Sequence, residues 1–202
     1  MKKRAAVFVS GSGTNLENIV KKIKHHELSC DIVSVVCDNP KAFALIRAMK
    51  FGIESFVIER SNFQSKAEFE ATITEHLQHK KVDLILLAGY MRILSPEFVK
   101  LWQGKILNVH PSLLPKFPGA HSIKDAFEAK EKETGATIHF VTEEVDGGPI
   151  ILQKRVPIHP DDTLETLEGR VHEAEYEIYP EAIKLFCDAK LTIENAKVKI
   201  KS

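Results

Sequence analysis

The sequence predicts an α/β fold: a Rossmann-like, mostly parallel twisted sheet with helices on both faces and an antiparallel C-terminal portion. Short apolar runs rich in β-branched residues alternate with longer amphipathic stretches as far as residue 109. Some runs are apolar throughout, which is typical of strands covered on both faces. The length of 202 residues suits one such domain. We therefore expect a single domain over residues 1–202.

Strands and helices alternate in the first half of the chain. Strands are expected at residues 5–9, 32–37, 55–58, 84–87 and 106–109. Helices are expected at residues 15–24, 42–50 and 63–79, and another begins at Pro96 behind the capping residue Ser95. This order predicts parallel strands joined by right-handed crossovers.

The second half has a different pattern. Residues 111–119 carry three prolines and no periodicity, which predicts a stiff irregular loop. A helix is expected at residues 122–132, then strands at 137–142 and 150–157, whose short link favours antiparallel pairing. A long helix is expected at residues 163–188, and a C-terminal segment from Val198 either adds an edge strand or frays.

Composition argues against several classes of partner. Lys+Arg and Asp+Glu number 28 each, so no overall charge attracts nucleic acid or a membrane surface. The apolar run at residues 5–9 is too short for a signal peptide, and no run approaches the ~20 residues of a membrane helix. Three scattered cysteines lack metal-ligand spacing and suit a reducing compartment. We expect a cytoplasmic protein without a metal.

Unusual polar residues follow three of the expected strands. They are found in Ser10-Gly11-Ser12-Gly13-Thr14-Asn15, in Ala88-Gly89-Tyr90-Met91-Arg92 and in Asn108-Val109-His110-Pro111. Open α/β sheets bind ligands beyond the carboxyl ends of their strands, where the strand order reverses. With a strand order of 3-2-1-4-5, the three segments would surround one crevice.

The first of these segments is suited to a phosphate. Gly11 and Gly13 would let the backbone approach an anion, and the helix that follows would direct free N–H groups at it. The segment lacks the third glycine of a dinucleotide fingerprint and the lysine of a P-loop. The alternative is an ordinary tight turn in which Asn15 caps the helix.

The other candidates are a histidine and two polar neighbours. Asn108 and His110 are two residues apart, so a strand would place both side chains on one face. Asp146 could reach His110 from the Asp-Gly turn and raise the pKa of its imidazole by favouring the charged form. The alternatives are a structural histidine and an ordinary turn aspartate. His121 and His139 could also line the site, but each could equally be structural.

At these residues the sequence resembles the phosphoribosylglycinamide formyltransferase family, the folate-dependent enzymes of purine biosynthesis. The resemblance rests on residues 10–15, 88–95, 108–115 and 135–149, in the family's order and spacing. The last two segments are shared by formyltransferases in general. The first segment, together with the short length, narrows the resemblance to the ribonucleotide enzyme.

The resemblance implies transfer of the formyl group of 10-formyltetrahydrofolate to the primary amine of glycinamide ribonucleotide. It implies a monomer or weak homodimer that acts on these two small molecules, without metal. The implied catalytic residues are Asn108, His110 and Asp146. The implied ribonucleotide contacts are Gly13, Thr14, Asn15, His172, Glu173, Ala174 and Glu175. The implied folate contacts are Lys66, Met91, Arg92, Ile93, Leu94, Asn108, Thr142, Glu143, Glu144, Val145 and Asp146. Lys66 stands where some relatives have arginine; it keeps the charge but lacks the guanidinium fork of a bidentate contact.

Three other functions are considered. Formyltetrahydrofolate hydrolase would use the same three catalytic residues with water as acceptor, and normally carries an extra N-terminal regulatory domain. Methionyl-tRNA formyltransferase would need a C-terminal RNA-binding domain and a basic surface. We expect neither addition, because the first strand begins near residue 5 and the charges balance. A non-catalytic phosphate-binding module would use the glycine loop alone.

Overall fold

The computed structural model describes residues 2–201, which form two compact units that divide after Leu107. The seven-stranded sheet has the order β3-β2-β1-β4-β5-β6-β7, which confirms the expected order of its first five strands. Its strands are β1 (Lys3–Val9), β2 (Cys30–Cys37), β3 (Ser55–Val57), β4 (Leu84–Leu87), β5 (Ile106–His110), β6 (Glu133–Phe140) and β7 (Ile150–Pro157). The helices are α1 (Thr14–Lys24), α2 (Phe43–Lys50), α3 (Lys66–His79), α4 (Pro96–Leu101), α5 (Ser122–Glu128) and α6 (Leu164–Cys187).

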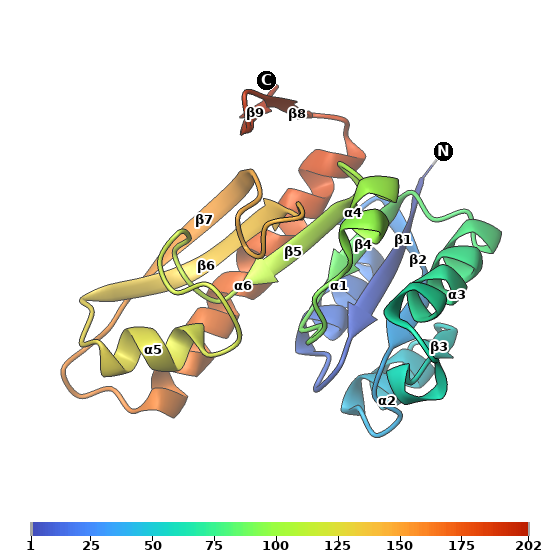
Figure 1. Ribbon diagram of the computed structural model, residues 1–202. Helices are drawn as coiled ribbons and strands as arrows, with labels where there is room; N and C mark the ends of the chain where they lie inside the picture. Colours follow the sequence, from blue (N-terminus) through green and yellow to red (C-terminus); the bar gives the residue numbers. More distant parts are fainter. Residues whose placement is uncertain (1, 202) are drawn as a thin grey trace. The chain divides into compact units, whose positions relative to one another are not determined.

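The first unit is a parallel sheet covered on both faces. Strand β1 pairs in parallel with β2 and β4, and β2 pairs in parallel with β3. Right-handed crossovers place α1 and α2 on one face of these strands and α3 on the other, as Figure 1 shows. All four residues of β4 are buried, which explains its continuous apolar run.

Helix α3 begins later than the sequence indicated. Residues 60–62 form a 3₁₀ turn, and the Ser65 hydroxyl then accepts the Glu68 backbone N–H at 3.0 Å. Capping at Ser65 starts the helix at Lys66, not at Phe63.

The second unit is built on an antiparallel hairpin. Strand β6 pairs with β7 from Glu133 opposite Pro157 to His139 opposite Ile150, and α6 packs along both strands (Figure 1). Two short strands, β8 (Leu191–Glu194) and β9 (Lys197–Ile200), form a separate antiparallel hairpin. The C-terminal segment is therefore a strand in its own small sheet.

The expected helix at residues 122–132 is too long. Helix α5 ends at Glu128, because Lys130 adopts a left-handed φ of 54° and Glu131 N–H turns back to the Ala126 carbonyl at 3.2 Å. Strand β6 consequently begins at Glu133, four residues before the expected start.

Residues 2–201 contain neither a membrane-spanning helix nor a metal-binding cluster. Within residues 2–201 no helix is long and apolar enough to cross a membrane. In the same part of the chain, no three His, Cys, Asp or Glu side chains are grouped so that they could hold a metal ion.

Candidate active site

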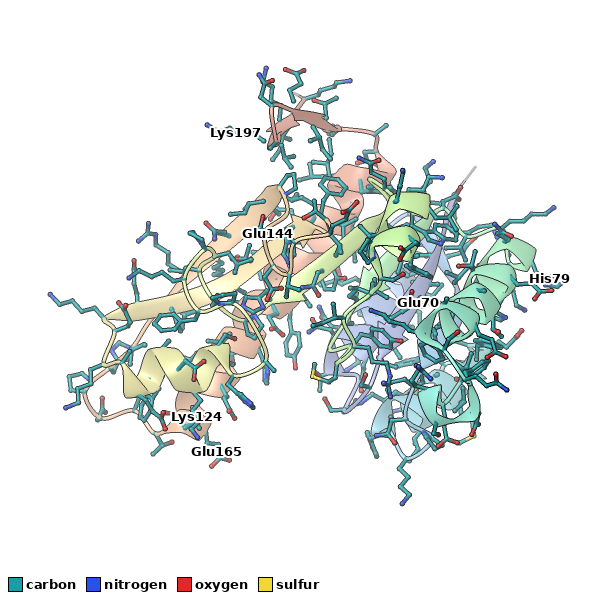
Figure 2. All side chains as sticks on the ribbon, in the orientation of Figure 1. Glu70, His79, Lys124, Glu144, Glu165 and Lys197 are labelled. Atoms are coloured by element: carbon teal, nitrogen blue, oxygen red, sulfur yellow. The ribbon has the colours of Figure 1, made fainter. Side chains whose placement is uncertain are left out.

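A cluster of polar side chains in the second unit is centred on Asp146. Strand β5 supplies Asn108 and His110, strand β6 supplies His139, and the link between β6 and β7 supplies Asp146. That link, which also carries Glu144 (Figure 2), turns sharply at Asp146, whose φ is 54°. A side chain on the nearby Gly148 would place its Cβ 1.8 Å from a backbone oxygen, so the turn requires glycine there.

The Asp146 carboxylate contacts every other member of this cluster. One oxygen, Oδ2, accepts the Gly119 N–H at 2.8 Å and lies 3.5 Å from His110 Nδ1. The other, Oδ1, accepts from Asn108 Nδ2 at 3.5 Å and lies 3.7 Å from His139 Nε2. Burial acts to raise the pKa of Asp146, but hydrogen bonds and the two imidazoles outweigh it, and the pKa is lowered. The carboxyl group is therefore ionised at neutral pH.

His110 is held between two acceptors. Its Nε2 lies 2.9 Å from the Phe117 carbonyl oxygen, which can only accept, so Nε2 carries a hydrogen. Its Nδ1 faces Asp146. Burial lowers the pKa of His110, and although the Phe117 carbonyl and Asp146 both act to raise it, they do not overcome burial. The expected rise is thus corrected: Asp146 acts in that direction, but only 4% of His110 is exposed and desolvation prevails.

The histidine on β6 determines how the Asn108 amide is oriented. His139 Nδ1 lies 2.9 Å from the Phe140 carbonyl oxygen, so Nδ1 carries a hydrogen and Nε2 can accept one. Asn108 Nδ2 donates one hydrogen to that Nε2 at 3.1 Å and directs the other at Asp146. These two contacts use both hydrogens of the Asn108 amide. The sequence alone did not distinguish His139 from a structural histidine.

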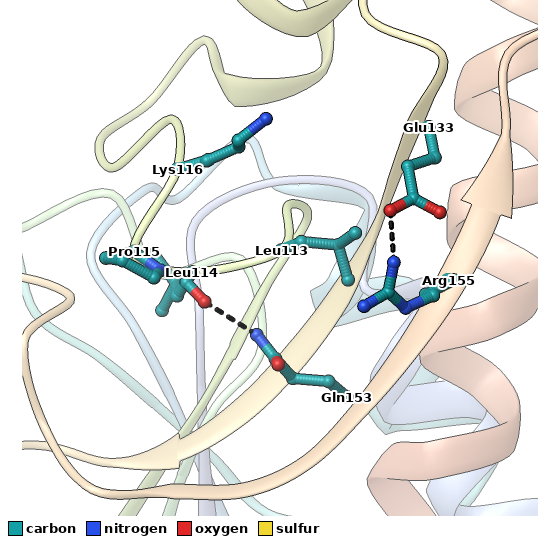
Figure 3. A pocket seen from close by; sticks show the side chains of 7 residues that line it. All are labelled: Leu113, Leu114, Pro115, Lys116, Glu133, Gln153 and Arg155. Atoms are coloured by element: carbon teal, nitrogen blue, oxygen red, sulfur yellow. Dashed lines mark hydrogen bonds and ion pairs between the residues drawn. The ribbon is translucent and has the colours of Figure 1, made fainter.

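The loop after β5 is anchored to the β6–β7 hairpin. The peptide bond between Leu114 and Pro115 in this loop is cis. Thr137 Oγ1 donates to the Ser112 carbonyl at 2.7 Å, and Gln153 Nε2 donates to the Leu114 carbonyl at 2.9 Å. Figure 3 shows the latter contact at a pocket of ≈ 480 Å³. The anchors hold the segment whose later residues contact His110 and Asp146.

The glycine loop, residues 10–15, lies in the first unit and leads into α1. Ser10 N–H donates to the Gly89 carbonyl at 3.0 Å, and Ser10 Oγ accepts the Met91 N–H at 2.9 Å. The ends of β1 and β4 are therefore adjacent, as expected. Gly13 caps α1 with a left-handed φ of 73° and no side-chain hydrogen bond. The cap is thus Gly13 and not Asn15, so no capping side chain binds the N–H groups of the first turn.

The segment after β4 exposes apolar side chains. Met91 and Ile93 are 69% and 65% exposed, whereas Leu94 is buried. Arg92 Nε lies 2.6 Å from a carboxylate oxygen of Asp38, so its charge is already paired within the first unit. Lys66 stands at the first turn of α3 and lies 3.9 Å from a buried glutamate. Two exposed apolar side chains on one loop are suited to an aromatic ring.

On the second unit, the remaining candidates differ in exposure. Val145, in the link between β6 and β7, is 51% exposed. In α6, His172 and Glu173 are exposed, whereas Ala174 and Glu175 are buried in the packing of the helix. A ligand can therefore reach the first two directly, while the other two support the helix.

Chemically, the second unit contains what an acyl-transfer enzyme needs: an N–H donor directed at a carbonyl oxygen and backed by a carboxylate. The formyl transferase family model matches residues 3–183, and the chain belongs to this family. It is 45% identical over 193 residues to the phosphoribosylglycinamide formyltransferase of Haemophilus influenzae, covering 96% of this chain and 91% of that one.

Two further relatives extend the comparison. The trifunctional purine biosynthetic protein adenosine-3 of Drosophila melanogaster is 44% identical over 194 residues, 95% of this chain, which spans only 14% of that protein's length. The crystal structure of glycinamide ribonucleotide transformylase 1 from Symbiobacterium toebii superposes with a TM-score of 0.97 at 41% identity, covering 100% of this chain and 95% of that one. The fold expected from the sequence is thus the fold of this family.

Proposed function

We propose that the chain transfers the formyl group of 10-formyltetrahydrofolate to the primary amine of glycinamide ribonucleotide. It would do so as one formyltransferase domain over residues 1–202, a monomer or weak homodimer acting in the cytoplasm. The observation that carries the proposal is the His110 Nε2–H, which donates to a carbonyl oxygen at 2.9 Å while Asp146 lies at Nδ1. A formyl oxygen is an acceptor of the same kind and would replace the Phe117 carbonyl.

The chemical step follows from this arrangement. The amine nitrogen attacks the formyl carbon, a C–N bond forms, and negative charge grows on the formyl oxygen. His110 donates to that oxygen, and Asp146 stabilises any positive charge on the imidazole. Asn108, whose amide hydrogens bind His139 and Asp146, would accept a hydrogen from the attacking amine at its carbonyl oxygen. The bond from carbon to folate N10 then breaks, and the proton lost by the amine is delivered to N10.

Substrate binding is assigned by chemistry. Gly13, Thr14 and Asn15 would hold the phosphate of the ribonucleotide at the start of α1. The exposed His172 and Glu173 would contact the rest of it, supported by the buried Ala174 and Glu175. Met91–Leu94, Asn108 and residues 142–146 would bind the folate, with Lys66 near its acidic tail. The exposure of Met91 and Ile93 supports a flat ring there.

The deciding experiment is a turnover assay with purified protein. It would be incubated with 10-formyltetrahydrofolate, with and without glycinamide ribonucleotide, and both tetrahydrofolate and formylated product would be quantified. Stoichiometric release of the two products only when the ribonucleotide is present is the expected result. Release of formate without it would indicate a hydrolase, and absence of turnover would leave a phosphate-binding module.

A further inference from the structure

We infer that Arg47, on α2, is a positioning residue for phosphate binding: it holds the glycine loop with its N–H groups toward the ligand and neutralises the acidic residue in the first turn of α1. The inference deepens the proposed function, because it assumes that this loop takes the phosphate. All the residues concerned belong to the first unit.

Three consecutive carbonyl groups of the loop are bound from the same segment of the chain. Asn39 Nδ2 donates to the Ser10 carbonyl at 3.2 Å, and Ala44 N–H donates to the Gly11 carbonyl at 3.1 Å. Arg47 Nε donates to the Ser12 carbonyl at 2.9 Å. With its carbonyl oxygens held toward residues 39–47, the loop turns the opposite edge of its peptides, the N–H edge, toward a ligand.

Arg47 also binds the helix that this loop starts. Its guanidinium forms an ion pair with Glu17, in the first turn of α1, and stacks over the Phe43 ring at 4.9 Å. The Arg47 side chain is 23% exposed and the Glu17 side chain 17%, so their ion pair is partly shielded from water. One planar group thus fixes both the last peptide before Gly13 and the first turn after it.

The charge of Glu17 makes this contact relevant to an anion. A carboxylate in the first turn of a helix stabilises the helix, but it also repels a phosphate that binds at the same end. Lys21 pairs with one oxygen of Glu17 at 2.8 Å, and Arg47 pairs with the other. Without Arg47, the helix end would present a less neutralised carboxylate to an incoming phosphate.

The loop packs closely against α2 at Gly13. A Cβ on Gly13 would lie 2.6 Å from the Ala44 Cβ and 2.8 Å from the Ala44 Cα, so the loop is in direct contact with α2. By contrast, a Cβ on Gly11 would meet nothing within 4 Å. Helix α2 therefore packs against the loop at Gly13, and its Arg47 side chain holds the loop in place.

The test is binding of ribose 5-phosphate, measured by calorimetry on the full chain, together with KM and kcat for both substrates. Arg47→Ala should weaken ribose 5-phosphate binding and raise the KM for glycinamide ribonucleotide by about tenfold, the scale of one hydrogen bond to a charged group. The value of kcat and the KM for 10-formyltetrahydrofolate should stay within about twofold of wild type.

Two further variants separate the charge from the hydrogen bond. Arg47→Gln keeps an N–H for the Ser12 carbonyl without the charge, and should lie between wild type and Arg47→Ala. Adding Glu17→Gln to Arg47→Ala should restore the part of the loss that is due to charge. The matched control is Arg60→Gln, because Arg60 also donates to a backbone carbonyl, that of Phe63 at 2.7 Å. This variant should leave the ribose 5-phosphate affinity and the KM for glycinamide ribonucleotide unchanged.

The possible outcomes distinguish this inference from the proposed function. A folded Arg47→Ala variant with unchanged ribose 5-phosphate affinity would overturn the inference, as would wild-type protein that does not bind ribose 5-phosphate. Equal losses for both substrates would show that Arg47 only supports the fold. If Arg47→Ala does not fold, unchanged ribose 5-phosphate affinity in Arg47→Gln would overturn the inference instead. Arg47-dependent binding without any formyl transfer would support the inference and refute the proposed function.

Discussion

Replacing Asp146 by Asn tests the active-site assignment most directly. Asparagine has nearly the same shape and tolerates the left-handed backbone, φ 54°, that this position adopts. The substitution therefore removes the charge and one acceptor oxygen without disturbing the turn. Alanine would strain the backbone as well and would confuse the result.

The structure sets the size of the expected effect. Each of the two carboxylate oxygens accepts a hydrogen bond, and in asparagine one of them becomes an NH₂ group. One hydrogen bond to a charged group is therefore lost, which costs about 1.5–3 kcal/mol. The attraction between this carboxylate and a protonated His110, whose Nδ1 lies 3.5 Å away in a buried site, is lost as well, and we take a contribution of about the same size. At about 1.36 kcal/mol per tenfold, the sum of roughly 3–6 kcal/mol corresponds to a loss in kcat/KM on the order of 10²–10⁴.

The assay is the pH dependence of formyl transfer. Burial lowers the pKa of His110, and Asp146 partly counteracts that decrease, so removing the carboxylate should lower this pKa further. If the imidazolium is the active form, kcat/KM falls as pH rises through the His110 pKa. That limb should shift to lower pH in Asp146→Asn.

Two comparisons make the result interpretable. Asp162→Asn removes a carboxylate elsewhere in the second unit, one that pairs with Arg170, and should change kcat by less than about threefold. His110→Ala should lose about as much as Asp146→Asn, and the double variant far less than the product, because the two residues act as one unit. A multiplicative loss or an unshifted pH profile would show that Asp146 only shapes its turn.

Three further results are expected. Gly13→Val should weaken ribonucleotide binding at least tenfold and leave folate binding intact, as measured by calorimetry. Gly11→Ala, which adds a methyl group in open space, should fold normally. Equal loss of affinity for both substrates in Gly13→Val would show that the loop is structural. His139→Ala should lower kcat by about tenfold in steady-state kinetics, because it frees the Asn108 amide to rotate. His139→Gln, which can still accept at its carbonyl oxygen, should recover part of that loss. Equal kcat values for the two variants would refute the orienting role of His139. Because burial lowers the pKa of His110 below its unfolded value near ~6.5, folding releases protons there, and the free energy of unfolding in urea should fall as pH drops below that value, less steeply in His110→Gln.

The sequence alone determined most of the fold. Strand β4 matched residue for residue, because four consecutive buried apolar residues leave no periodicity to misread. Element ends were harder to place, since they depend on single residues. Lys130, in a left-handed conformation, ended α5 early, and Ser65 delayed α3 by capping it. Neither effect is visible in hydrophobic spacing.

The candidate site, like the fold, was predicted only in part from the sequence. The sequence marked Asn108, His110 and Asp146 as candidates, because polar residues beside strand ends and glycine turns can be recognised locally. It left structural roles open for the histidine and the aspartate, and the family resemblance favoured catalytic ones. Only the tertiary structure showed the contacts made over long stretches of chain. Examples are the His139 ring that orients the Asn108 amide, 31 residues away, and the Arg47 side chain bound to the Ser12 carbonyl, 35 residues away.

The pKa of His110 shows why the sequence predicts some properties of the site and not others. The sequence correctly indicated the direction in which a nearby carboxylate acts, because that follows from charge alone. It could not indicate the opposing desolvation, since burial is a property of everything packed around the ring, and here burial prevails. The identity and order of the reactive groups are local properties of the sequence, whereas their hydration, orientation and hydrogen-bond polarity are set by packing between distant segments.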